Sequence, residues 1–251
     1  MLSTQRYEIG NGTATSGKGQ LMKITYIYHS GFLVETDSCY YLFDYYKGTL
    51  PPMNREKPIL VFASHSHPDH YNQEIFPLLR DMGMEQITAV LSKDISPRRY
   101  PQETEVIRVT FHQQYQLPCE TVLETLQSTD AGVAFLVRCK EGLLYHAGDL
   151  NDWTWAGETK QYNRQMTGSY RHEIDLLQKD LLKGLSLDAA FLPLDPRQEK
   201  DYARGILYFL KKTAAKKVYP MHYWEKPEVI QQFLKEYPGY EDCIQNTEQT
   251  V

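Results

Sequence analysis

The feature that most constrains this chain is an apolar run, residues 58–63, that leads directly into His65-Ser66-His67-Pro68-Asp69-His70. A continuous apolar run of this length is typical of a strand that is buried on both faces. Residues 71–82 then predict a helix directly after the cluster. A strand buried on both faces needs a layer of structure on each side. The pattern therefore predicts a layered α/β fold with metal-ligand-type side chains at the end of a central strand.

The cluster carries four side chains of the kinds that bind metals. His65 and His67 are two positions apart, so at the end of an extended strand their side chains leave on the same face. Asp69 and His70 follow where the chain turns into the helix and can point at an adjacent position. Two-metal hydrolases hold their ions roughly 3.5–4 Å apart, and this cluster could serve both ions. The alternative is a polar loop with water-facing histidines, which would have to account for three of the eight histidines after one apolar strand.

Strand-like and helix-like segments fall into two groups along the chain. The early β-rich runs at 23–29, 31–36 and 40–44 predict an antiparallel meander. Later strands are predicted at 88–92, 105–110, 121–127, 132–139, 143–147, 189–194 and 218–221, and later helices around 174–182, 202–212 and 227–237. No linker rich in proline or glycine separates the groups, so we expect one domain over residues 22–251, with two packed sheets and helices outside. Residues 1–21 are polar and glycine-rich and are predicted to be a flexible extension.

Composition narrows the classes of function. The net charge is −5, from 27 basic and 32 acidic residues, which gives no attraction for phosphate backbones and disfavours a nucleic-acid partner. No apolar run approaches the length of a membrane span, and the first residues lack the apolar stretch of a signal peptide. The four cysteines are widely spaced and form no CxxC pair, which favours reduced thiols. We therefore expect a cytoplasmic protein that acts on a small molecule and leave its oligomeric state open.

Three stretches carry a resemblance to a known family. The His65-x-His67-x-Asp69-His70 cluster after its apolar strand resembles the first signature of the metallo-β-lactamase superfamily. Residues 144–149, Leu-Tyr-His-Ala-Gly-Asp, resemble the family's strand that ends in Gly-Asp, and residues 218–222, Val-Tyr-Pro-Met-His, resemble its late strand that ends in a histidine. The early Tyr28-His29-Ser30-Gly31-Phe32-Leu33 stretch is most similar to the branch of compact metal-dependent hydrolases that contains the L-ascorbate-6-phosphate lactonases.

The resemblance implies a four-layer αββα sandwich with two divalent metal ions at one edge, between the sheets. It assigns His65 and His67 to one metal, Asp69, His70 and His222 to the other, and Asp149 to a bridging position. The ions implied are zinc, with manganese or iron as alternatives. The chemistry implied is hydrolysis of an ester, lactone or phosphodiester by a hydroxide that the metals hold, with Asp69 orienting this nucleophile or accepting its proton.

The sequence departs from the family pattern at one metal ligand. The family usually has a further histidine before the strand that leads to Gly-Asp, and residues 128–132, Ser-Thr-Asp-Ala-Gly, contain none. Asp130 is the nearest ligand-type substitute, and it would shift the preference from zinc towards manganese or iron. The alternative for Asp130 is an ordinary turn residue beside Gly132.

Five further side chains are candidates for the surroundings of the metals. His146 is three residues before Asp149, an offset that points it to the opposite face of a strand, so a supporting or core role is expected. Each of the others has a plain structural alternative: a satisfied polar residue for His29 and Asp44, cover for a sheet edge for Trp153, and an ion pair with Asp195 for Arg197. Their functional roles would be support of the ligands or the wall of a substrate pocket, in which Arg197 could hold an anionic group.

A metal-dependent hydrolase of small molecules is therefore the predicted function. One alternative is a nuclease or phosphodiesterase of the same superfamily, which the acidic charge disfavours. Another is an iron redox protein, which would need a flavin-binding partner domain. A third is a metal-binding scaffold without catalysis, suggested only by the missing histidine. Metal content and turnover separate these classes.

Overall fold

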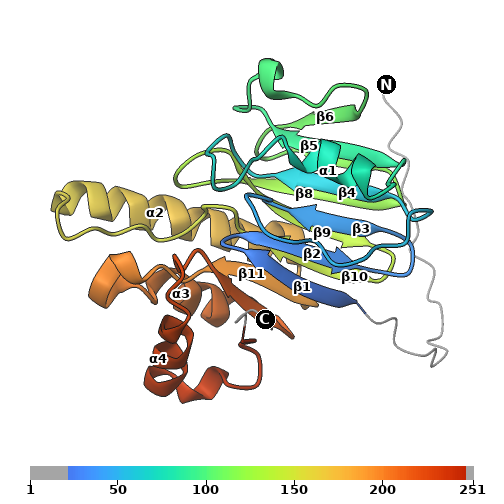
Figure 1. Ribbon diagram of the computed structural model, residues 1–251. Helices are drawn as coiled ribbons and strands as arrows, with labels where there is room; N and C mark the ends of the chain where they lie inside the picture. Colours follow the sequence, from blue (N-terminus) through green and yellow to red (C-terminus); the bar gives the residue numbers. More distant parts are fainter. Residues whose placement is uncertain (1–21, 247–251) are drawn as a thin grey trace, which may run out of the picture.

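The computed structural model of the protein describes residues 22–246, which form two six-stranded sheets with helices on their outer faces (Figure 1). The predicted extension at residues 1–21 lies outside the described residues. The first sheet has the order β1-β2-β3-β4-β5-β6. Its strands are β1 (Lys23–Tyr28), β2 (Gly31–Glu35), β3 (Tyr40–Phe43), β4 (Ile59–Ala63), β5 (Ile87–Ser92) and β6 (Glu105–Val109). The predicted meander is confirmed, since β1, β2 and β3 pair antiparallel, whereas β3 to β6 run parallel.

The second sheet has the order β12-β11-β10-β9-β8-β7. Its strands are β7 (Gln114–Leu117), β8 (Thr121–Gln127), β9 (Val133–Cys139), β10 (Gly142–His146), β11 (Ala189–Pro193) and β12 (Val218–Met221). Strands β7 to β10 pair antiparallel, and β10, β11 and β12 run parallel. Strand β7 was not predicted from the sequence, because this short edge strand alternates two glutamines with Tyr115 and Leu117 and so has little apolar signal.

Helices cover both outer faces. They are α1 (Ile75–Asp81), α2 (Lys160–Leu176), α3 (Arg204–Lys212) and α4 (Glu228–Glu236), with a π-helical turn at Leu177–Leu182 and 3₁₀ turns at Pro97–Arg99, Pro196–Asp201 and Pro238–Tyr240. Figure 1 shows α1 beside the first sheet and α2, α3 and α4 beside the second. No helix among residues 22–246 is both long enough and apolar enough to cross a membrane.

Alternation along the central strands explains the layers. In β4, Leu60 and Phe62 join the core between the two sheets, whereas Ile59, Val61 and Ala63 join a second core under α1. Every residue of β4 is buried, as the apolar run predicted. One face of the second sheet closes the inner core and the other is covered by α2, α3 and α4, so the predicted four-layer αββα sandwich is confirmed.

Two helices differ from the predicted bounds for local reasons. α1 begins at Ile75 rather than at residue 71, because the Asn72 side chain accepts a hydrogen bond from the Glu74 backbone N–H and donates one to the Tyr46 carbonyl, forming a turn before the helix. α2 begins at Lys160, well before the apolar residues around 174. Its first turns are mostly exposed and polar, and the Thr159 hydroxyl caps them by accepting from the Tyr162 backbone N–H.

The carboxyl ends of parallel strands gather the polar residues at one edge. Asp44 follows β3, His65 follows β4, Asp149 follows β10, Asp195 follows β11, and His222 follows β12. The parallel pairs β3–β4 and β10–β11–β12 bring these ends side by side within each sheet. Because the two sheets pack face to face, one edge of the sandwich collects side chains from both.

Two glycines allow the second sheet to approach the loop after β4. Gly132 has φ +70°, and a Cβ there would lie 1.9 Å from the Ser64 carbonyl oxygen. Gly148 has φ +52°, and a Cβ there would lie 2.7 Å from the Ser64 Cβ. The Val133 backbone N–H also donates to the Ser64 carbonyl at 3.0 Å. Both contacts bring the segments that carry Asp130 and Asp149 up to the loop after β4.

Candidate metal centre

The first group of candidate ligands contains His65, His67, Asp130 and Asp149, each of which offers a ligand atom within 4.8 Å of the others. His65 Nε2 lies 3.0 Å from His67 Nδ1 and 3.5 Å from Asp149 Oδ2. His67 Nδ1 lies 3.8 Å from Asp130 Oδ2. The structure therefore brings Asp130 to the place where a third histidine was expected.

The second group contains His29, Asp69, His70 and His222, again within 4.8 Å. Asp69 Oδ2 lies 3.4 Å from His29 Nε2 and 4.0 Å from His70 Nε2. His29, expected as a supporting residue, is thus placed among the ligand-type side chains. It occupies the turn between β1 and β2 with φ 56°, and its carbonyl accepts from the His222 backbone N–H at 3.2 Å.

Asp149 lies between the two groups. Its Oδ1 is 3.2 Å from His70 Nε2 and 3.4 Å from His222 Nε2, while its Oδ2 faces His65. One carboxylate thus presents a different oxygen to each group. This is the arrangement that a bridging ligand between two ions requires.

The histidines are held from behind by hydrogen bonds to their other ring nitrogen. Asp44 Oδ2 is 2.7 Å from His70 Nδ1, and the same carboxylate accepts from the Ser64 backbone N–H and the Ser64 hydroxyl at 2.7 and 2.6 Å. His65 Nδ1 lies 3.0 Å from the Ser64 hydroxyl. A carboxylate behind an imidazole fixes its tautomer and orientation, as at many metal sites.

Asp195 supports the remaining histidine from the second sheet. Its Oδ2 lies 3.0 Å from His222 Nδ1 and accepts from Trp224 Nε1 at 3.2 Å. The Arg197 guanidinium donates to both Asp195 oxygens and packs against Trp224, with its central carbon 4.4 Å from the ring centroid. From the sequence, Asp195 was expected only as a partner of Arg197. A carboxylate directly after a buried strand, as at Asp44, was the signal that could have identified it.

His146 and Trp153 pack beneath the centre. His146 is fully buried, and its Nε2 lies 2.9 Å from the Ser30 carbonyl while its Nδ1 accepts from the Gly148 backbone N–H, so it belongs to neither ligand group. Trp153 donates from Nε1 to the Asp149 carbonyl at 2.8 Å and stacks on Trp155. These contacts fix the backbone around Asp149, as expected of residues that support ligands.

Charge and burial at the centre fit a cation. His29 Nε2, His70 Nε2 and Asp149 Oδ1 are buried and face other ligand-type side chains of these two adjoining groups. Burial opposes ionisation of Asp149, but the charges of His70 and His222 hold its pKa well below the usual range. Burial opposes protonation of His70, but Asp149 and Asp44 raise its pKa well above the usual value. The position of His70 between these two carboxylates therefore favours a positive charge. A bound cation would supply that charge in place of a proton.

The other imidazoles are already suited to ligation. Burial and the neighbouring His70 lower the pKa of His65 to about 4, so its ring is neutral at pH 7. Burial likewise lowers the pKa of His29, against the opposing effect of Asp69. Neutral imidazole nitrogens and carboxylate oxygens together suit zinc, manganese or iron.

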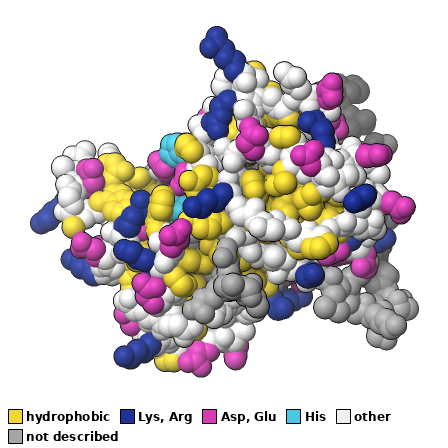
Figure 2. Space-filling model, in the orientation of Figure 1, with side chains coloured by type: hydrophobic (Ala, Val, Ile, Leu, Met, Phe, Trp, Pro, Cys, Tyr) yellow, Lys and Arg dark blue, Asp and Glu magenta, His cyan; other side chains and the backbone are white. Residues whose placement is uncertain are grey.

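A small hollow of about 130 Å³ opens onto the centre, and Asp149, His222, Asp130 and Trp153 are among the residues that line it. On the face shown in Figure 2, exposed histidine atoms occupy a small area beside hydrophobic surface. The hollow gives a small molecule access to both groups.

The family of the chain follows from its match to a protein-family model. A model of the beta-lactamase superfamily domain matches residues 23–164, more than half of the chain. The chain belongs to the beta-lactamase superfamily. No curated protein matches the sequence.

Solved structures agree on the fold of this beta-lactamase superfamily member. Igni18, a metallo hydrolase from the archaeon Ignicoccus hospitalis, is 18% identical with a TM-score of 0.61, and the match covers 89% of this chain and 94% of that chain. YhfI from Bacillus subtilis, a metallo-beta-lactamase fold protein, is 13% identical with a TM-score of 0.56, over 89% and 95%. CmlA from Streptomyces venezuelae, a diiron β-hydroxylase, is 12% identical with a TM-score of 0.57, over 90% and 53%.

Proposed function

We propose that this protein is a metal-dependent hydrolase that cleaves an ester, lactone or related bond of a small molecule at a binuclear centre. The observation that carries the proposal is the position of Asp149, which presents one oxygen to His65 and the other to His70 and His222. Under this proposal His65, His67 and Asp130 hold one ion, and His29, Asp69, His70 and His222 surround the other. Igni18, which shares the fold, is described as a metallo hydrolase.

Two divalent ions held here would acidify a coordinated water and polarise the substrate oxygen. The protein's own residues supply position and charge. Asp69 is the one carboxylate of the second group, and 23% of its side chain is accessible, so it can orient the attacking water and accept its proton. Asp44 and Asp195 keep His70 and His222 from turning away, and Trp153 with Trp155 forms a wall that limits water.

The surroundings favour an uncharged substrate at the metals. Arg197 is the one basic residue that lines the hollow within residues 22–246, and its guanidinium is already bonded to both oxygens of Asp195. A phosphate on the substrate would therefore have to share this guanidinium with Asp195, whose carboxylate already balances its charge. We carry over from the L-ascorbate-6-phosphate lactonases, to which the early stretch is similar, the class of bond but not the phosphate. A long nucleic acid is disfavoured for the same reason and by the net charge of −5.

Metal analysis and a substrate panel test this proposal. Protein purified without chelators is expected to contain close to two ions of zinc, manganese or iron per chain and to turn over lactones or esters more readily than phosphodiesters. His67→Ala and Asp149→Ala should lose metal and activity while keeping the far-UV circular dichroism of the wild type. Asp188→Ala, at the opposite end of β11, serves as the control and should retain both. Preference for phosphodiesters would instead support a nuclease, and bound metal without turnover would support a scaffold.

A further inference from the structure

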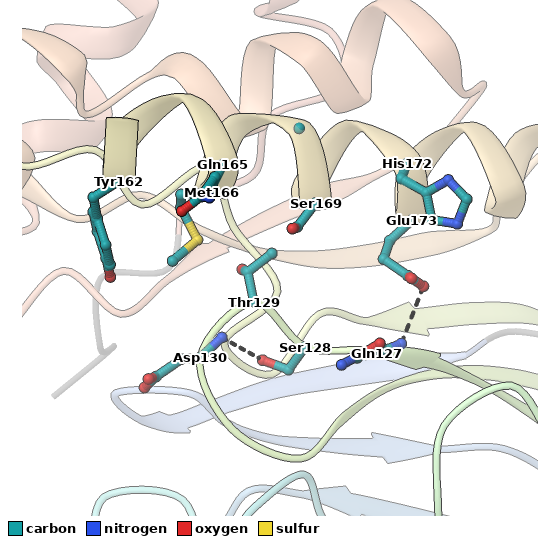
Figure 3. Close-up of a pocket in the computed structure, with 11 residues that line it drawn as sticks. Gln127, Ser128, Thr129, Asp130, Tyr162, Gln165, Met166, Ser169, His172 and Glu173 are labelled. Atoms are coloured by element: carbon teal, nitrogen blue, oxygen red, sulfur yellow. Dashed lines mark hydrogen bonds between the residues drawn. The ribbon is translucent and has the colours of Figure 1, made fainter. Parts of the chain in front are cut away.

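A second, larger cleft lies beside the metal hollow. It has a volume of about 560 Å³ and runs between α2 and the loop that joins β8 to β9. Figure 3 shows Tyr162, Met166 and Ser169 of α2 on one side and Ser128 and Asp130 of the loop on the other. Binding sites for small ligands usually have volumes of about 300–1,000 Å³, so this cleft can hold most of a small molecule.

The cleft adjoins the hollow at the metal centre. Thr129, Asp130, Tyr162 and Met166 line both. In Figure 3 these residues lie towards one end of the cleft, and His172 lies at the other. A ligand with its reacting bond at Asp149 can therefore extend past Asp130 along α2.

The lining of the cleft carries no charge that is free for a ligand. Within residues 22–246 it contains no lysine or arginine. The Glu173 carboxylate is bonded to His112 Nε2, at 3.1 and 3.0 Å, and to the Gln127 backbone N–H, at 3.1 Å. Asp130 faces His67, where a bound ion would balance its charge. Apart from the His172 imidazole at the far end, an anionic group would meet no basic side chain of the described residues here, and a cationic group would meet no unpaired carboxylate.

Uncharged hydrogen-bonding groups remain. Among the described residues, the side chains of Gln165 and Ser169 make no hydrogen bond to the protein, and both line the cleft. An amide and a hydroxyl each donate and accept. The Tyr162 ring, 38% exposed, and the Met166 thioether add an apolar surface at the junction with the metal hollow.

We propose that this cleft is the subsite for the non-reacting part of the substrate, and that it selects an uncharged group with hydroxyl or amide functions. This assignment rests on the proposed function, because it places the reacting bond at the metal centre. It adds a substrate class that the metal centre alone does not define.

Hydroxamates test the subsite without turnover, because the hydroxamate binds the metal while its tail reaches the cleft. The probes are acetohydroxamate and three suberoyl-length hydroxamates that end in a primary amide, a carboxylate or an ammonium group. Dissociation constants are measured by isothermal titration calorimetry on zinc-loaded protein. The amide-tailed probe is expected to bind at least tenfold more tightly than acetohydroxamate, and the two charged tails should gain less than threefold.

A blocked cleft gives the matched comparison. Ser169→Leu puts a larger side chain into the middle of the cleft and keeps a good helix-forming residue in α2. It should abolish the gain from the amide tail and leave acetohydroxamate unchanged, whereas Ser169→Ala should keep most of the gain. An equal gain for the carboxylate tail, or a full gain in Ser169→Leu, would overturn the subsite. Failure of acetohydroxamate itself to bind would instead overturn the metal centre, and the subsite with it.

Discussion

Replacing Asp44 with asparagine is the sharpest test of how the centre is held. Asp44 is fully buried and accepts three hydrogen bonds, from the Ser64 backbone N–H, the Ser64 hydroxyl and His70 Nδ1. Asparagine has the same shape but only one acceptor oxygen. The backbone N–H of Ser64 can only donate, so the amide oxygen must stay on it. The amide NH₂ group then faces Ser64 Oγ, which can turn to accept, and His70 Nδ1.

The substitution changes the protonation of the other ring nitrogen of His70, Nε2. If Nδ1 must accept from the amide, a neutral ring carries its proton on Nε2, the atom that lies 3.2 Å from Asp149 Oδ1. A protonated Nε2 cannot bind a metal. Loss of a carboxylate behind a ligand histidine typically weakens metal binding by about 10–100-fold, equivalent to roughly 1.4–2.7 kcal/mol. We expect the Asp44→Asn variant to reach or exceed the upper end of that range for one of the two ions.

The assay is competition for zinc with a chelator of known affinity, read for each of the two ions. Asp188→Asn is the matched control, because Asp188 also accepts a backbone N–H, that of Leu143, but at the far end of the sheet. The control should leave both zinc affinities unchanged. Equal affinities in Asp44→Asn and wild type would refute the assignment of His70 as a ligand held through Asp44.

Three further changes test other parts of the structure. His29→Gln should weaken binding of one zinc ion at least about tenfold in the same competition, because His29 Nε2 is buried and faces Asp69 within the second ligand group. Unchanged affinity would remove His29 from the ligands. Burial would raise the pKa of Asp195, but hydrogen bonds from His222 and Arg197 outweigh it and bring the pKa to about 2, below its ordinary value of 3.8. The Asp195 carboxylate therefore contributes roughly 2 kcal/mol to the free energy of unfolding above pH 4, and this contribution is lost as the pH falls towards 2. In urea unfolding of the metal-free proteins, the difference in unfolding free energy between wild type and Asp195→Asn should shrink over that pH range, and a constant difference would contradict the prediction. Gly132→Ala should lower the unfolding free energy by about 3 kcal/mol or more, since its Cβ would lie 1.9 Å from a carbonyl oxygen at a positive φ. Gly168→Ala in α2 is the control. A Cβ there meets nothing within 4 Å, so this change should raise the unfolding free energy by up to about 1 kcal/mol.

The layers of the fold could be predicted because the apolar pattern of each strand indicates which of its faces are buried. The run at 58–63 is apolar at every position, and β4 is buried on both faces. Exposed polar elements carry no such signal. The first turns of α2 contain residues such as Gln161 and Arg164 that face solvent, so their helical structure depends on the Thr159 cap rather than on an apolar face.

From residue spacing alone, the candidate site could be predicted only where ligands are close in sequence, whereas Asp149 and His222 were predicted through the family resemblance. His65 to His70 share one loop, so their proximity follows from chain connectivity. His29 and Asp195 reach the same centre from the β1–β2 turn and the end of β11, and their proximity depends on how the two sheets pack. No periodicity within either segment encodes that packing. Carboxylates directly after buried strands, as at Asp44 and Asp195, are the local pattern that indicates such contributions.

Asp130 connects the two proposals. It stands where the family pattern has a histidine, 3.8 Å from His67, and it also lines both the metal hollow and the larger cleft. Its carboxylate belongs to the first group of candidate ligands, together with His65, His67 and Asp149. Under the two proposals, the loop that supplies this metal ligand also forms part of the substrate subsite, so a change at Asp130 is expected to alter both metal affinity and binding in the cleft.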